Sequence, residues 1–180
     1  MMDRLVASLA STLRTSVGYA DPAEALVVLA ICLGIALLAG LGVRKSAVAG
    51  LLAGYVWLVI SSTVLGRARH AARAIKAMPL WSWWEVIANG RVSLLAENLL
   101  NVAMTIPVGL LMQPLLGDRV SGWQRVGLTV GVSAMLEVAI EASQYFLLRG
   151  LAEWDDVIHG VVGALLGLAI WAVGKKLATL

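Results

Sequence analysis

The sequence predicts an all-α integral membrane protein, a helical bundle of five transmembrane helices with a short N-terminal interfacial helix. Of the 180 residues, 60% are hydrophobic and only 14% are charged, against about 25% charged residues in an ordinary soluble domain. Mean hydropathy is +0.87. Long apolar stretches recur, and each approaches the roughly 20 residues that a helix needs to cross about 30 Å of hydrocarbon. These stretches are residues 25–43, 46–66, 98–117, 126–148 and 157–174.

The start of the chain is expected to lie along the membrane surface. Apolar residues recur there at every fourth position, a spacing that places them on one face of a helix, and two arginines nearby can reach the headgroups. Polar residues interrupt the run before Ala23, which does not resemble a cleaved signal peptide. We therefore predict an interfacial segment over residues 1–22, with a frayed tail as the alternative, and a transmembrane domain over residues 23–180.

A polar stretch, residues 67–97, separates the second and third spans. Its first ten residues carry several basic side chains, and we interpret them as a basic amphipathic turn of helix. The segment PLWSWWE follows at residues 79–85 and gathers three tryptophans. Tryptophan favours the headgroup level because an indole is apolar yet can donate a hydrogen bond. This segment is therefore predicted to anchor the chain at the membrane surface.

Two of the predicted spans carry patterns that require close neighbours. Asn98 and Asn101 share one face of the third span. An amide exposed to lipid would leave polar groups unsatisfied, so this face is expected to contact other helices. In the last span small residues recur at Gly160, Gly163 and Gly167. Such a pattern lets another helix approach closely.

The fourth span carries two carboxylates at membrane depth. Glu137 and Glu141 interrupt an otherwise uncharged run, and Gln144 follows on the same helical face. A carboxylate near the bilayer centre costs roughly 2.5–3.5 kcal/mol on the lenient insertion scales, so it normally faces protein or a wet cavity. The sequence therefore predicts that this span holds either chemistry or demanding polar packing inside the membrane.

Polar groups from several spans are expected to meet on one side of the membrane. Because consecutive spans are antiparallel, the ends of the second and fourth spans lie beside the starts of the third and fifth. The short basic connections at the other side favour the cytoplasm under the positive-inside rule, so the polar pocket is expected to face outside. Its predicted members are Arg67, Asn98, Asn101, Glu141, Gln144, Arg149, Glu153, Asp155, Asp156 and His159.

These residue types suit catalysis. In the catalytic hypothesis Glu141 is the general base, and Asp155 and Asp156 hold a divalent metal or position the acid. Arginines would bind phosphate or carboxylate through paired hydrogen bonds. The candidate substrate-binding residues are Arg67, Arg91, Asn98, Asn101, Glu137, Gln144, Arg149 and His159.

Other interpretations stay open. The same side chains could bind a ligand without converting it, or form a buried network that only fixes helix register. A transporter is less favoured, because five helices show no inverted repeat. Asp155, Asp156 and His159 include ligand types of a divalent-metal site, yet no second histidine lies near them, so we expect no resident metal or cofactor. The net charge of +3 has no nucleic-acid motif beside it and is ascribed to membrane lipids. The oligomeric state is left open.

Three ordered motifs resemble those of VanZ-like membrane proteins. Residues 97–111, ENLLNVAMTIPVGLL, are similar to the family's eNxxNxxxfxPxGfLL segment. Residues 155–167, DDVIHGVVGALLG, resemble its DDvixNxxGaxxG ending, although His159 stands where asparagine is usual. The family's SxxxExxxExxQxxxxR pattern is similar to the set Ser133, Glu137, Glu141, Gln144 and Arg149.

The resemblance implies a bacterial inner-membrane protein of the cell envelope. The family's founding member is linked to low-level resistance to the glycopeptide teicoplanin, and other relatives occur beside envelope-polysaccharide functions. We therefore expect the pocket to bind or modify a lipid-linked or glycopeptide-related envelope substrate, such as a peptidoglycan precursor, with a contribution to teicoplanin resistance inferred from the founding member alone. The alternative is a non-catalytic binding or shielding protein whose buried polar network is mainly structural.

Overall fold

The computed structural model describes residues 45–179 apart from 66 and 68, together with residues 4, 6, 7, 10 and 11. The predicted first span, 25–43, and most of the predicted interfacial segment, 1–22, lie outside the described residues. The described elements, in chain order, are α3 (Lys45–Ile60), the π-helical turn η1 (Ser61–Leu65), β1 (Ile75–Lys76), α4 (Trp81–Asn89), α5 (Val92–Leu116), α6 (Gly122–Leu147), β2 (Ala152–Glu153) and α7 (Trp154–Leu177).

Four of the described helical segments are long and apolar enough to cross a membrane, namely α3 with η1, α5, α6 and α7. They correspond to the second to fifth predicted spans. The third span starts at Val92 and not at the predicted residue 98, and the last starts at Trp154 and not at 157. Both predicted starts were placed after the last charged residue, whereas a helix begins with a polar turn that can lie at the headgroups.

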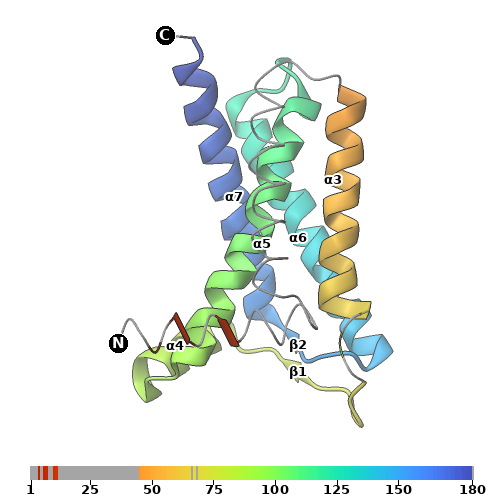
Figure 1. Cartoon of the computed structure of the whole chain (residues 1–180), viewed down its shortest axis with the longest axis vertical. Coiled ribbons are helices and arrows are strands. Elements are labelled where there is room, and N and C mark those ends of the chain that lie inside the picture. The colour runs from red at the N-terminus through yellow and green to blue at the C-terminus, as the bar shows by residue number, and fades with distance from the viewer. Residues whose placement is uncertain are drawn as a thin grey trace.

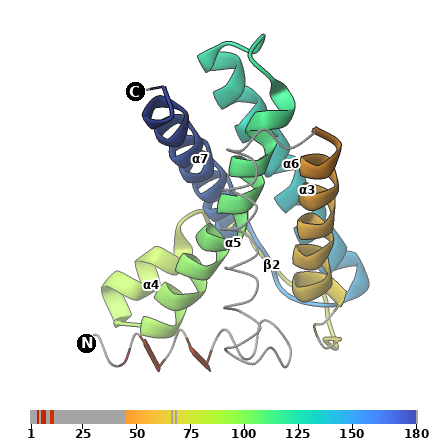
Figure 2. The same cartoon turned by 45° about the horizontal axis from the view of Figure 1, so that its top comes forward.

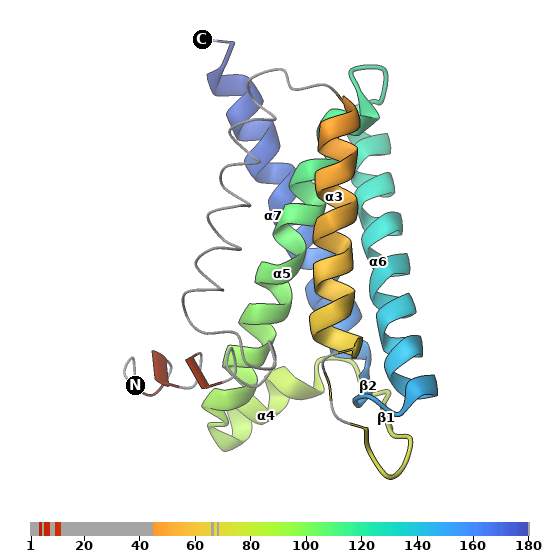
Figure 3. The same ribbon diagram turned by 45° about the vertical axis from the view of Figure 1, so that its right-hand side comes forward.

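The four long helices run side by side, and the two ends of the bundle differ (Figure 1). One end carries η1, α4, β1, β2 and the first turn of α7, and we call it the polar end. The opposite end carries the start of α3, the α5–α6 connection and the C-terminus. Figures 2 and 3 show α4 lying across the polar end, beside the start of α5.

Among the described helices, α5 and α7 make the most extensive contact, and the small-residue pattern of the last span predicted such a close neighbour. A Cβ atom added at Gly163 would lie 2.0 Å from the carbonyl oxygen of Val102, and one added at Gly109 would lie 1.9 Å from that of Ala164. Real Cβ atoms do not approach oxygen so closely, so only glycine fits at either position. Close backbone contact gives α5 and α7 the van der Waals packing that associates helices in lipid. This contact fixes the α5 and α7 walls of the polar end.

Helix α3 packs against the other side of α5 through an apolar cluster. Tyr55, Val59 and Val64 are buried there with Val108 of α5 and Ile140 of α6. The Tyr55 hydroxyl donates to the carbonyl oxygen of Met104 at 2.7 Å, so its buried polar atom has a partner. The cluster brings η1, at the end of α3, next to the last turns of α6.

The polar end is closed by a two-residue parallel pairing of β1 with β2. Ile75 lies opposite Ala152, and Lys76 lies opposite Glu153. The Lys76 ammonium contacts the Glu153 carboxylate at 3.2 Å and lies 3.8 Å from the ring centroid of Trp81. The prediction of a helical turn over residues 67–76 was wrong, because the described part of this segment is irregular, contains no helix and ends in β1. The pairing of this segment with a loop that is distant in the sequence cannot be predicted from a local pattern of side chains.

The opposite end is held together by buried Arg125. Its guanidinium donates to the carbonyl oxygen of Gln113 at 3.2 Å and to that of Gly117, both at the end of α5. The same group lies 4.6 Å from the ring centroid of Trp171 in α7. Nearby, the Lys175 ammonium contacts exposed Asp118 at 2.5 Å and holds the pKa of that carboxyl below its ordinary value. Three helices therefore meet around one cation.

Candidate functional site

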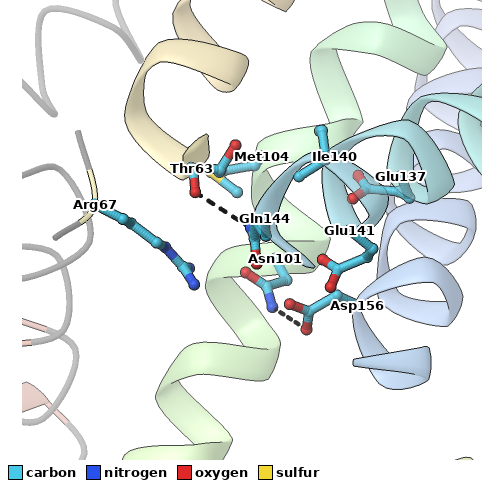
Figure 4. A pocket seen from close by; sticks show the side chains of 9 residues that line it. All are labelled: Thr63, Arg67, Asn101, Met104, Glu137, Ile140, Glu141, Gln144 and Asp156. Atoms are coloured by element: carbon cyan, nitrogen blue, oxygen red, sulfur yellow. Dashed lines mark hydrogen bonds between the residues drawn. The ribbon is translucent and has the colours of Figure 1, made fainter. Parts of the chain in front are cut away.

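A polar pocket lies at the polar end, between η1, α5, α6 and α7 (Figure 4). Each wall comes from a different element, so the pocket exists only when the bundle is assembled. Carboxyl groups come from α6 and α7, an amide from each of α5 and α6, and a guanidinium from the segment after η1. The lining residues are Thr63, Arg67, Asn101, Met104, Glu137, Ile140, Glu141, Gln144 and Asp156.

Three carboxyl groups face this pocket at different depths. Asp156, in the first turn of α7, accepts a hydrogen bond of 2.6 Å from the Asn101 side-chain amide. Glu141 accepts one of 2.8 Å from the backbone N–H of Glu153. Glu137 lies one helical turn deeper on α6, and its side chain packs on Gly160, where an added Cβ would lie 2.3 Å from its Cγ. Both glutamates are 7% exposed, so the protein and not lipid surrounds them.

Gln144 connects α6 to the end of α3. Its amide nitrogen donates to the carbonyl oxygen of Thr63 at 3.2 Å, while its amide oxygen is buried and accepts no hydrogen bond from the described residues. An added Cβ at Gly150, where φ is +148°, would lie 2.6 Å from that oxygen and 3.1 Å from an Arg67 guanidinium nitrogen. The loop after α6 therefore passes so closely over Gln144 that a side chain at Gly150 would collide with it.

The arginines lie at the rim. Arg67 points toward the pocket from outside the carboxyl groups (Figure 4), and Arg149 donates to the Arg67 carbonyl oxygen at 3.4 Å. Arg91 lies elsewhere: it pairs with Glu85 at 3.4 Å and is more than half exposed. Of the predicted arginines, only Arg67 is a pocket wall, and Arg149 contacts its backbone.

Two predicted residues on α7 serve α4 and are not pocket walls. Asp155 accepts hydrogen bonds from the backbone N–H groups of Leu80 and Ser82, at the start of α4. His159 accepts a hydrogen bond of 2.8 Å from the indole N–H of Trp83 at its Nε2. This bond assigns the ring proton of a neutral His159 to Nδ1. Both α7 side chains are 2% exposed.

His159 lies directly behind the pocket carboxylate on α7. Its Nδ1 is 4.0 Å from Oδ1 of Asp156 and has no hydrogen-bond partner among the described residues. Asn98, the remaining predicted site residue, is buried on α5 and does not line the pocket. Its amide nitrogen also has no hydrogen-bond partner among the described residues.

Glu153 borders the site outside the membrane-spanning segments. Burial raises the pKa of its carboxyl above the ordinary value, and the opposing effect of the Lys76 ammonium is smaller. Among the described residues, no three histidine, cysteine, aspartate or glutamate side chains come together in a way that could hold a metal ion.

The sequence pattern did not reveal several parts of the site. The Thr63 carbonyl, the apolar walls Met104 and Ile140, and the Trp83 donor to His159 all come from contacts between distant segments. Only the tryptophan had a local signal, its place in a cluster of three.

Comparison with protein-family models identifies the family of this chain. The sequence model of the VanZ/LLP1 family matches residues 46–175. The chain belongs to the VanZ/LLP1 family. The match runs from α3 to near the end of α7 and so includes every helix that lines the pocket. The predicted resemblance to VanZ-like proteins is thereby confirmed. No curated protein and no solved structure matches the chain at a significant level.

Proposed function

We propose that this VanZ-family protein works in the bacterial inner membrane, with its pocket facing outside, and binds the polar head of a lipid-linked envelope substrate. One observation carries the proposal: three carboxyl groups, two amides and a guanidinium from four segments of the chain line one pocket at the end of a membrane bundle. Burying such groups near lipid is costly unless they have polar partners. A ligand headgroup entering from the membrane surface would supply partners that the protein leaves incomplete.

The site also has the parts for modifying such a substrate. Glu141 is the candidate general base, and Asp156, held by Asn101, is the candidate acid or positioning carboxylate. Arg67 at the rim is the candidate phosphate-binding group, because guanidinium pairs with phosphate through two parallel hydrogen bonds. The geometry supports binding of the lipid headgroup best. Chemical modification of the bound lipid depends in addition on the roles given to Glu141 and Asp156.

Native mass spectrometry of the protein released from its own membrane tests the binding proposal. We expect a lipid-linked species to remain bound to the wild type, to be lost from Arg67→Gln, and to remain bound to Asp118→Asn, a variant of an exposed carboxylate at the opposite end. If wild type and Arg67→Gln release the same lipids, the pocket does not bind a headgroup. The alternative, a mainly structural network, predicts lower thermal stability without any change in bound lipid.

Catalysis and resistance need separate assays. Glu141→Gln keeps an acceptor for the Glu153 N–H but removes a base, so turnover of a lipid-linked substrate should stop even when the substrate is supplied at a saturating concentration. Equal turnover by the two proteins would leave a binding or shielding role. A contribution to teicoplanin resistance predicts that cells expressing the wild type tolerate more of the glycopeptide than cells expressing Arg67→Gln at the same protein level.

A further inference from the structure

One buried acceptor of the pocket lacks a hydrogen-bond donor. Each of the two side-chain amides donates one N–H within the protein: Asn101 to Asp156, and Gln144 to the Thr63 carbonyl. The Gln144 amide oxygen, in contrast, is buried in a side chain only 1% exposed and has no partner among the described residues. A ligand that brings hydrogen-bond donors would satisfy this oxygen.

The charges in the pocket are also uneven. Glu137, Glu141 and Asp156 contribute three carboxyl groups, and Arg67 is the one cationic side chain among the pocket residues. No salt bridge of 4.0 Å or less joins Arg67 to any of them in the described structure. Arg67 lies at the rim and the carboxyl groups lie farther in (Figure 4). A pocket with acidic groups inside and a guanidinium at its rim suits a ligand whose positive charge enters the pocket and whose negative charge stays at the rim.

From these contacts we infer that the pocket takes a zwitterionic headgroup, with a protonated primary amine placed among the carboxyl groups and Gln144 and a phosphate placed on Arg67. The inference rests on the proposed function and names its substrate class. An ammonium group brings three donors and a positive charge, and charge-assisted hydrogen bonds to carboxylates are the strong kind. It is also small enough for the narrow space between these side chains, which is of the order of one water molecule.

An ammonium suits the arrangement better than a metal ion. Among the described residues, no three histidine, cysteine, aspartate or glutamate side chains meet closely enough to hold a metal ion, whereas an ammonium needs less closely spaced acceptors, because its hydrogen bonds are about 2.7–3.2 Å long. Two kinds of envelope lipid carry this chemistry: an amine-bearing phospholipid such as phosphatidylethanolamine, and an amino sugar attached to a polyprenyl phosphate. Both present an amine and a phosphate in one head.

A lipid series tests the inference on the wild-type protein alone. The purified chain is placed in nanodiscs of neutral phosphatidylcholine doped with phosphatidylethanolamine, N-acetylated phosphatidylethanolamine or phosphatidylglycerol, and retained lipids are counted by native mass spectrometry. A fourth arm uses a polyprenyl-phosphate amino sugar and its N-acetylated form. We expect each free-amine lipid to be retained about tenfold more than its acetylated partner, equivalent to about 1.4 kcal/mol. The stronger of the two free-amine arms identifies the source of the headgroup.

Variants then locate the contact. Glu141→Gln should reduce the preference for the free amine, Arg67→Gln should reduce retention of all the phosphate lipids alike, and Asp118→Asn should change neither. Equal retention of free and acetylated amines would overturn the inference while leaving the proposed headgroup binding intact. No retention of any lipid above the phosphatidylcholine background would overturn both.

Discussion

Ser82, in the first turn of α4, donates both its backbone N–H and its hydroxyl to the Asp155 carboxylate of α7, at 2.8 and 2.5 Å. The residue before α4 is Leu80, which adopts a left-handed conformation with φ of 59° and supplies no side-chain cap. A helix leaves its first N–H groups without intrahelical partners. Here the Asp155 side chain of α7 accepts from one of them, the Ser82 N–H, so α4 is positioned by α7.

Removing this cap should loosen α4 more than the rest of the bundle. We expect Asp155→Ala to lower the free energy of unfolding by about 1–3 kcal/mol, since a helix cap and buried charge-assisted hydrogen bonds are lost together. Hydrogen exchange should speed up in α4 first. Asp118→Asn removes an exposed carboxylate at the opposite end and serves as the control. Unchanged exchange in α4 of Asp155→Ala would show that the cap does not hold this helix.

The contact between α5 and α7 gives a prediction with a matched pair on one helix. Gly163→Ala would place a Cβ 2.0 Å from the Val102 carbonyl oxygen, whereas a Cβ at Gly174 meets nothing within 4 Å among the described residues. We expect Gly163→Ala to destabilise the bundle by about 1–3 kcal/mol or more through overpacking. Gly174→Ala should be neutral or slightly stabilising, because alanine favours helix. Thermal unfolding in one detergent compares the two, and equal melting temperatures would contradict the described contact.

Much of the architecture could be predicted because membrane helices have strong local signals. Length and hydropathy located α3, α5, α6 and α7, and the glycine pattern of α7 correctly predicted a close neighbour. Local patterns failed where backbone pairs with a distant loop. Ile75 lies opposite Ala152 in a two-residue strand pairing, and the Ala152 N–H donates to the Ala74 carbonyl oxygen, whereas basic composition alone suggested a helix there.

The site was predictable to the extent that polar residues in a span must find polar surroundings. That rule correctly brought Asn101, Glu141 and Asp156 toward one another. Adjacent helical residues point in different directions, so only one of Asp155 and Asp156 can face the pocket. Helical spacing from Asp156 leads along the face that carries Gly160 and Gly163, which favours Asp156, and Asp156 lines the pocket. The sequence could not assign Arg91 to its surface pair with Glu85, because the direction of the loop that carries Arg91 depends on how α4 docks.

The hydrogen bond from the Trp83 indole should determine which ring nitrogen of His159 carries the proton. Trp83→Phe keeps an aromatic ring but leaves Nε2 of a buried histidine without its donor, at a cost of about 1–3 kcal/mol. Nitrogen NMR should find the proton of His159 on Nδ1 in the wild type and a changed nitrogen spectrum in the variant. Trp84→Phe is the control, since Trp84 is mostly exposed. If both variants give the same spectrum and stability, the indole bond does not set the state of His159.

Arg125 should matter for its shape and not only for its charge. Its guanidinium spans two carbonyl oxygens at the end of α5 and lies over Trp171, and a lysine ammonium cannot reproduce that planar fork. We expect Arg125→Lys to keep the membrane orientation, which depends on charge, yet to lose about 1–3 kcal/mol of stability as buried carbonyls lose their partners. Arg119→Lys, at an exposed position in the connection that precedes α6, should change neither. Cysteine accessibility on both membrane sides reports orientation, and thermal unfolding reports stability. A bundle as stable with lysine as with arginine would mean that charge alone is what this position requires.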